Sequence, residues 1–219
     1  MKKGTLLAIS IGIALVLWAG THLRGARRQY INITDQIHLN LGHWTPEDFP
    51  LPVGVDVSSF SQVERERIFE VLEYWNSVIG ERVFEPNEID LDFHISRGVL
   101  LEPSHGEIFV QEIELGISEE RGNFLGLTEL HTGSYNLDFT QVNNGVVLLD
   151  NDISHEELFI VAVHEFGHVL GLGHDGDVNS VMFPHVLEST GVIMQDDIDY
   201  IRRQLRPRFM PNFFMGTPF

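Results

Sequence analysis

Three histidines and a glutamate lie close together in the stretch from His164 to His174, with types and spacing suited to a metal site. His164 and His168 are four residues apart, so on a helix they lie on one face, one turn apart. Two imidazoles placed in this way reach one metal ion, and the His-Glu-x-x-His pattern is typical of zinc sites. The spacing therefore predicts a zinc-binding helix.

The residues that follow predict how a third ligand reaches the metal. Gly171 and Gly173 are expected to end the helix, because glycine adopts the left-handed backbone found at many helix ends. The chain then turns, and His174 can approach the metal from a third direction. Three protein ligands and an open fourth position are typical of catalytic zinc. In the alternative interpretation, the histidines merely line a half-buried helix.

The motif and the segment after it resemble a known family. The stretch reads HExxHxxGxxH, and Ser180–Pro184 follows as a methionine turn, which together form the metzincin signature. Among metzincins, the chain resembles the matrixins over roughly residues 49–205. The resemblance implies an α+β metzincin-like zinc protease domain. Such a domain has a twisted, mixed five-stranded sheet with an antiparallel edge strand, an amphipathic helix, the zinc-binding helix, a Met-turn and a C-terminal helix.

A matrixin-like chain is expected to be a zinc-dependent endopeptidase. The resemblance implies that one catalytic zinc ion is bound by His164, His168 and His174. Glu165 would act as general base on a zinc-activated water, and Met182 of the Met-turn would pack beneath the metal without binding it. Two alternatives remain: a zinc-bound but non-proteolytic interaction protein of the same fold, and a zinc hydrolase of another substrate class.

The resemblance also predicts how substrate and further metals bind. Phe124–Leu130 falls at the antiparallel edge strand, whose free backbone groups would pair with an extended protein or peptide substrate. A second, structural zinc is not expected, because Leu127 and Leu148 occupy the positions of its later ligands. Asp150 and Asp152 offer carboxylates suited to calcium. A metal-free acidic loop is the alternative.

The amino-acid composition excludes disulfides and argues against some classes of binding partner. The chain has 219 residues and no cysteine, so disulfides and a cysteine-based latency switch within it are excluded. A net charge of −18 repels phosphates, which argues against a nucleic-acid partner. We expect a monomer.

The pattern of residues at the N-terminus predicts that the protein is exported from the cytoplasm. An apolar run at 5–20 follows two lysines and has the length of a signal-peptide core. We therefore interpret residues 1–28 as a signal-anchor, attached to the membrane if uncleaved, or as a signal peptide. Either interpretation implies an extracytoplasmic protein, membrane-anchored or secreted. Residues 29–48 are then a linker, 49–206 the catalytic domain and 207–219 a tail.

Periodicity predicts the elements of the domain. Apolar residues at helical spacing indicate an amphipathic helix over 61–79 that ends at Gly80, and a last helix over 195–206. Apolar and β-branched runs predict strands over 51–57, 91–95, 107–115, 124–130 and 146–149.

Overall fold

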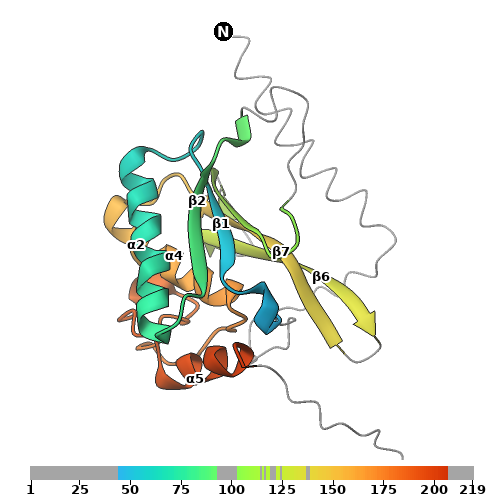
Figure 1. Cartoon of the computed structure of the whole chain (residues 1–219). Coiled ribbons are helices and arrows are strands. Elements are labelled where there is room, and N and C mark those ends of the chain that lie inside the picture. Colours follow the sequence, from blue (N-terminus) through green and yellow to red (C-terminus); the bar gives the residue numbers. More distant parts are fainter. Residues whose placement is uncertain are drawn as a thin grey trace, which may run out of the picture. The chain divides into compact units, whose positions relative to one another are not determined.

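The computed structural model (Figure 1) describes residues 44–92, 103–113, 115, 117–118, 122–123, 125–136 and 139–206. The predicted signal segment 1–28 and tail 207–219 lie outside the described residues, as does the predicted linker 29–48 up to residue 43. No helix within the described part of the chain is long and apolar enough to cross a membrane.

A mixed five-stranded sheet forms the framework of the domain. Its strands are β1 (Leu51–Asp56), β2 (Phe84–Ile89), β3 (Ile108–Ile113), β6 (Gly126–Asn136) and β7 (Phe139–Asp150). They lie in the order β2-β1-β3-β7-β6, and all pairs are parallel except β6 with β7. The short strands β4 (Ile117–Ser118) and β5 (Gly122–Asn123) form a separate antiparallel pair. The predicted mixed sheet with an antiparallel edge strand is confirmed.

Two long helices cover one side of this sheet (Figure 1). These are α2 (Gln62–Ile79) and α4 (His155–Val169), and the chain later forms α5 (Gln195–Gln204). Two 3-10 turns, η2 (Pro46–Asp48) and η3 (Val186–Glu188), are also present. The predicted helices over 61–79 and 195–206 are confirmed to within a few residues at their ends.

Buried aromatic side chains connect α4 to α2 and to the sheet. The Trp75 indole of α2 donates a hydrogen bond from Nε1 to the Val163 carbonyl of α4 over 3.2 Å. On the other side, Phe166 of α4 packs edge-on against Phe84 of β2, with ring centroids 5.1 Å apart. Both aromatic contacts involve fully buried side chains. The helix with the histidine motif is therefore held on two sides by the core.

Some strands differ from the prediction. Leu91 and Asp92 are helical, so the strand predicted over 91–95 is wrong where the structure describes it, and the rest lies outside the described residues. Strand β2 was not predicted, because Pro86 and two acidic residues, Glu85 and Glu88, interrupt its apolar pattern. Proline lacks the N–H that a central strand needs, but β2 lies at the edge of the sheet, where proline is tolerated.

The folded core reaches into the predicted linker. Trp44 is 1% exposed, and its Nε1 donates a 2.7 Å hydrogen bond to the Val169 carbonyl at the end of α4. Next to it, the Asp48 carboxylate accepts hydrogen bonds from the Thr45 N–H and hydroxyl and forms the η2 cap. The folded domain therefore includes Trp44 and η2, which precede the predicted boundary at residue 49.

Candidate metal centre

Helix α4 is preceded by a serine and followed closely by a glycine, two residue types that commonly cap helix ends. At its start, the Ser154 hydroxyl accepts from the Glu157 N–H, while the Glu157 carboxylate accepts from the Ser154 N–H. At its end, Gly171 has φ +85°, and the Gly171 and Leu172 N–H groups donate to the His168 and Gly167 carbonyls. This pattern is a Schellman motif, which turns the chain sharply. Gly173 does not take a positive φ, so Gly171 alone provides the left-handed turn.

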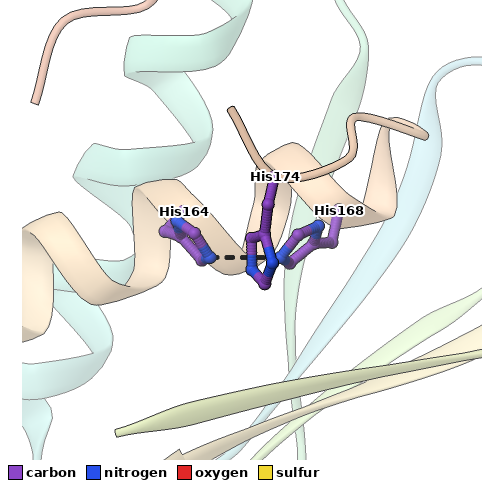
Figure 2. Close-up of side chains that lie close together, drawn as sticks. All are labelled: His164, His168 and His174. Carbon is purple, nitrogen blue, oxygen red and sulfur yellow. Dashed lines mark hydrogen bonds between the residues drawn. The ribbon is translucent and has the colours of Figure 1, made fainter. Parts of the chain in front are cut away.

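The turn brings the three predicted histidines together. His164 and His168 come from α4 and His174 from the loop after it, and Figure 2 shows their rings facing one another. One nitrogen from each ring can be chosen so that all three lie within 4.8 Å of one another. His164 is buried, and the other two are half-buried. Residues that are ten positions apart at most thus form one cluster of metal-ligating atoms.

Backbone carbonyls fix the orientation of two of the rings. His164 Nδ1 lies 2.7 Å from the Val181 carbonyl oxygen, and His168 Nδ1 lies 2.8 Å from the Leu172 carbonyl oxygen. A carbonyl oxygen can only accept, so each Nδ1 must carry the hydrogen. Each Nε2 then carries a lone pair, which is the form of histidine that binds metals.

The two lone pairs point into the same space. His164 Nε2 and His168 Nε2 are 3.1 Å apart, the contact drawn as a dashed line in Figure 2. With both hydrogens on Nδ1, neither Nε2 can donate to the other, so this contact is not a stabilising hydrogen bond. Two nitrogens bound to tetrahedral zinc at about 2.0–2.1 Å lie about 3.3 Å apart. The residues therefore fit a zinc ion in both separation and tautomer.

Burial keeps both helix histidines neutral. It lowers the pKa of His164 from 6.5 to about 4 and that of His168 to about 3, and the neighbouring His164 adds to the second shift. Both rings are consequently unprotonated at pH 7 without a metal, so a cation does not have to displace protons from them.

Glu165 faces the edge strand β6 and is 6% exposed. The Thr128 hydroxyl of β6 lies 2.7 Å from Glu165 Oε2 and 3.0 Å from the Glu165 carbonyl oxygen. Burial raises the pKa of the Glu165 carboxyl from 4.5 to about 7, and the hydrogen bond from Thr128 opposes this shift. A carboxyl with a pKa near neutrality can both take up and release a proton at pH 7.

Thr128 is the residue of this site that the sequence analysis missed. It lies within the predicted edge strand, but no role was assigned to it. The available signal was the spacing of Gly126 and Thr128, which are two residues apart and so lie on one face of a strand. On that face, Gly126 leaves space for a neighbouring side chain and Thr128 offers a hydroxyl, so the pair indicates contact with a polar group.

Met182 lies under α4. Its side chain is fully buried, and a Cβ built at Gly167 would collide with its sulfur. Gly167 lies between the two helix histidines in sequence, so the thioether fills the space below this turn of α4. The Met182 carbonyl accepts from the Asp175 N–H at 2.9 Å, which ties the Met-turn to the residue after His174.

The described residues contain no second cluster of three or more potential metal ligands. Leu127 and Leu148 lie directly opposite each other in the β6–β7 ladder. His105 instead lies beside Asp48, with its Nε2 3.0 Å from Asp48 Oδ1. Both Asp150 carboxylate oxygens accept backbone hydrogen bonds, from Leu115 and Asp152, and calcium binding there stays a prediction.

Comparison with known proteins adds a family match. The family model described as Matrixin matches residues 64–205, which include all but the first two residues of α2, the sheet from β2 onward, α4 and the Met-turn. Among solved structures, archaemetzincin from Methanopyrus kandleri aligns with a TM-score of 0.42 and 18% identity, over 76% of this chain and 98% of that chain.

Several curated proteins are similar over shorter stretches. Metalloendoproteinase 1 of Glycine max is 41% identical over 71 residues, which are 32% of this chain and 23% of that protein. Matrix metalloproteinase-27 of Tupaia belangeri is 46% identical over 54 residues, 23% of this chain and 10% of that protein. Interstitial collagenase A of Mus musculus is 32% identical over 146 residues, 64% of this chain and 28% of that protein. The aligned parts thus span 10% to 28% of these relatives.

Proposed function

This chain belongs to the matrixin family, and from that premise we propose that it is a zinc-dependent endopeptidase that cleaves extended protein segments. One observation carries the proposal: two histidines direct Nε2 lone pairs into one space, and a third histidine lies within reach of it. In such a site, zinc supplies a Lewis acid and lowers the pKa of its bound water to about 7.

The residues of the site then have separate roles in the proposed reaction. His164, His168 and His174 hold the ion, and the Val181 and Leu172 carbonyls keep the first two rings in the metal-binding tautomer. Glu165 takes a proton from water on its carboxylate and passes it to the leaving amine. In the metal-free chain, burial raises the pKa of this carboxyl to about 7, so its surroundings stabilise the protonated form that the first half of the transfer produces.

Substrate would bind along β6. Among the described strands, this one ends the sheet and pairs on one side only, with β7, so an extended peptide can pair with its outer backbone groups. Leu127 and Glu129 are exposed on the side away from the core, while Thr128 contacts α4. A peptide paired with this edge would therefore lie beside β6, the strand whose Thr128 contacts Glu165.

The N-terminal segment 1–28 as signal-anchor or signal peptide, the extracytoplasmic location and the monomeric state stay predictions.

The test is cleavage of an unstructured protein such as casein by the full-length chain, with and without a zinc chelator. We expect cleavage that the chelator abolishes and added zinc restores, and elemental analysis should find one zinc per chain. His168→Ala should lose zinc and cleavage together. His155→Ala, at the exposed start of the same helix, should lose neither.

Two results would contradict the proposal in different ways. A chain that retains zinc but cleaves nothing would support the alternative of a non-proteolytic interaction protein. Two zinc ions per chain after dialysis would reveal a structural site in addition to the three histidines.

A further inference from the structure

Strand β6 contacts Glu165 through two residues on the same face. Gly126, Thr128 and Leu130 alternate with exposed residues, and Leu130 packs against the core, so this face of β6 is directed toward α4. Thr128 donates its hydroxyl hydrogen to Glu165, with the shorter contact, 2.7 Å, to Oε2. A hydroxyl has one hydrogen to give, so the carboxylate is its principal acceptor.

Gly126 provides the space for the same carboxylate. A Cβ at this position would lie 2.6 Å from both Glu165 Cγ and Glu165 Oε1. Real side chains do not approach so closely, so any other residue at 126 would displace the Glu165 side chain. The glycine has no positive φ, and its lack of a side chain is therefore required by the neighbour and not by the backbone.

We propose that Thr128 is a positioning residue for Glu165 and that Gly126 makes this position sterically accessible. The Thr128 hydroxyl holds Oε2, which leaves Oε1 to take the proton from water. Among the described residues, Thr128 is the one side chain that donates a hydrogen bond to this carboxylate. The proposal rests on the endopeptidase function proposed above, and it adds a specific device on the substrate-binding strand that fixes the rotamer of the base.

A matched set of variants tests the proposal in the full-length chain. Thr128→Val keeps the shape and removes the hydroxyl, Thr128→Ser keeps the hydroxyl, and Gly126→Ala displaces the carboxylate. Thr45→Val is the control, because Thr45 also donates its hydroxyl to a carboxylate, that of Asp48, at 2.9 Å in η2. Zinc content is measured for every variant and should be unchanged.

With casein-derived peptide as substrate, Thr128→Val should lower kcat about tenfold or more while KM changes less than about twofold. Thr128→Ser should recover kcat to within about threefold of wild type. Gly126→Ala should lower kcat at least as much as Thr128→Val, and Thr45→Val should leave kcat and KM unchanged. Wild-type kcat in Thr128→Val, or equal losses in the serine and valine variants, would overturn the proposal.

A measurement without metal separates this proposal from the endopeptidase function. In the metal-free chain, Thr128→Val should lower the melting temperature by about 2–4 °C, and the loss should vanish when Glu165→Ala is already present. If the wild type cleaves nothing, the proposed function fails, and this thermal coupling alone decides whether Thr128 holds Glu165. Equal losses in both backgrounds would overturn the proposal.

Discussion

Helices α2 and α4 lie beside each other, joined by the hydrogen bond from Trp75 to the Val163 carbonyl, and their ends are built alike. Each starts with a capping box, formed by Ser61 with Glu64 in α2 and by Ser154 with Glu157 in α4. Each is followed closely by a glycine in the left-handed conformation, Gly80 for α2 and Gly171 for α4. The local signals that place the two helices are therefore the same.

Their buried faces differ. The buried residues of α2 are all apolar: Ile68, Val71, Leu72, Trp75 and Ile79. Helix α4 buries apolar residues too, but also His164, Glu165 and Gly167. Each buried polar group has a partner from another element, the Val181 carbonyl for His164 and the Thr128 hydroxyl for Glu165. The comparison teaches that capping residues define where a helix begins and ends. Hydrogen-bond partners on neighbouring elements are what allow its buried face to contain reactive polar side chains.

The largest expected difference between the helices is in catalysis. Glu165→Ala on α4 should lower kcat about 10²–10⁴-fold, because it removes the general base. Glu73→Ala, on the exposed side of α2, should leave kcat unchanged. Casein cleavage and elemental analysis check both variants, and zinc should stay at one per chain in each. Near-normal turnover by Glu165→Ala would remove this residue from the mechanism.

A second test compares the packing beneath each helix. Met182→Ala should cost about 2–5 kcal/mol of unfolding free energy, because it empties a fully buried position, and Met182→Leu less than about 1.5 kcal/mol. Leu72→Ala on α2 should cost a similar amount as Met182→Ala. Urea denaturation measures the losses, and competition with a chromophoric chelator measures zinc affinity. Only Met182→Ala should weaken zinc binding, and equal affinities would make Met182 an ordinary core residue.

The third test uses pH. Because burial raises the pKa of Glu165 from 4.5 to about 7, its contribution to stability is complete below pH 4.5 and is lost as pH rises through about 7. The shift corresponds to about 3 kcal/mol as an upper figure. Glu165→Gln cannot ionise, so in the metal-free chain it should be more stable than wild type at pH 8 and about equal to it at pH 4.5.

Two controls accompany that measurement, which is made by urea denaturation at both pH values. The lowered pKa values of His164 and His168 destabilise the fold as pH falls below 6.5, but they do so equally in both chains and cancel in the difference. Glu73→Gln on α2 should show no pH-dependent difference from wild type. If the stability difference between Glu165→Gln and wild type is also independent of pH, burial does not raise the pKa of Glu165.

The smallest expected effects come from the glycines. Gly167→Ala should cost about 1–3 kcal/mol, because the new Cβ meets the Met182 sulfur in a packed core. Gly80→Ala should cost about 1 kcal/mol, from its φ of +78° alone, since its nearest neighbour is the flexible end of Arg202 at 3.5 Å. Melting curves compare them. The loss in Gly167→Ala should shrink when combined with Met182→Ala, and strictly additive losses would argue against the contact.

Local sequence signals predicted the helices and the turn of the site. The helix over 61–79 and the turn at Gly171 follow from a 3.6-residue period and from glycine at the helix end, both of which act within a few residues. The three histidines could be singled out because their spacing matches one helical turn and the loop after it. Such patterns need no knowledge of distant contacts.

Features that depend on distant partners were not predictable. Strand β2 carries Pro86 and reads as polar, and only its edge position next to β1 explains why it is a strand. Strand β7 begins earlier than predicted, because Gln141, Asn143 and Asn144 interrupt the apolar pattern, although Gln141 and Asn144 still pair with β6. The contact of Thr128 with Glu165 joins residues 37 positions apart. The spacing of Gly126 and Thr128 indicates a polar contact on that face of the strand, but it does not identify Glu165 as the partner.

The two edges of the sheet have a consequence for how folded copies of the chain can aggregate. At the β2 edge, Pro86 lacks an N–H, and the carboxylates of Glu85 and Glu88 are paired with Arg82 and Arg65. Proline and charge at an edge oppose the addition of another strand. A fibril that grows by edge-to-edge pairing needs both edges of every molecule. Pairing through β6 alone joins two copies and then stops.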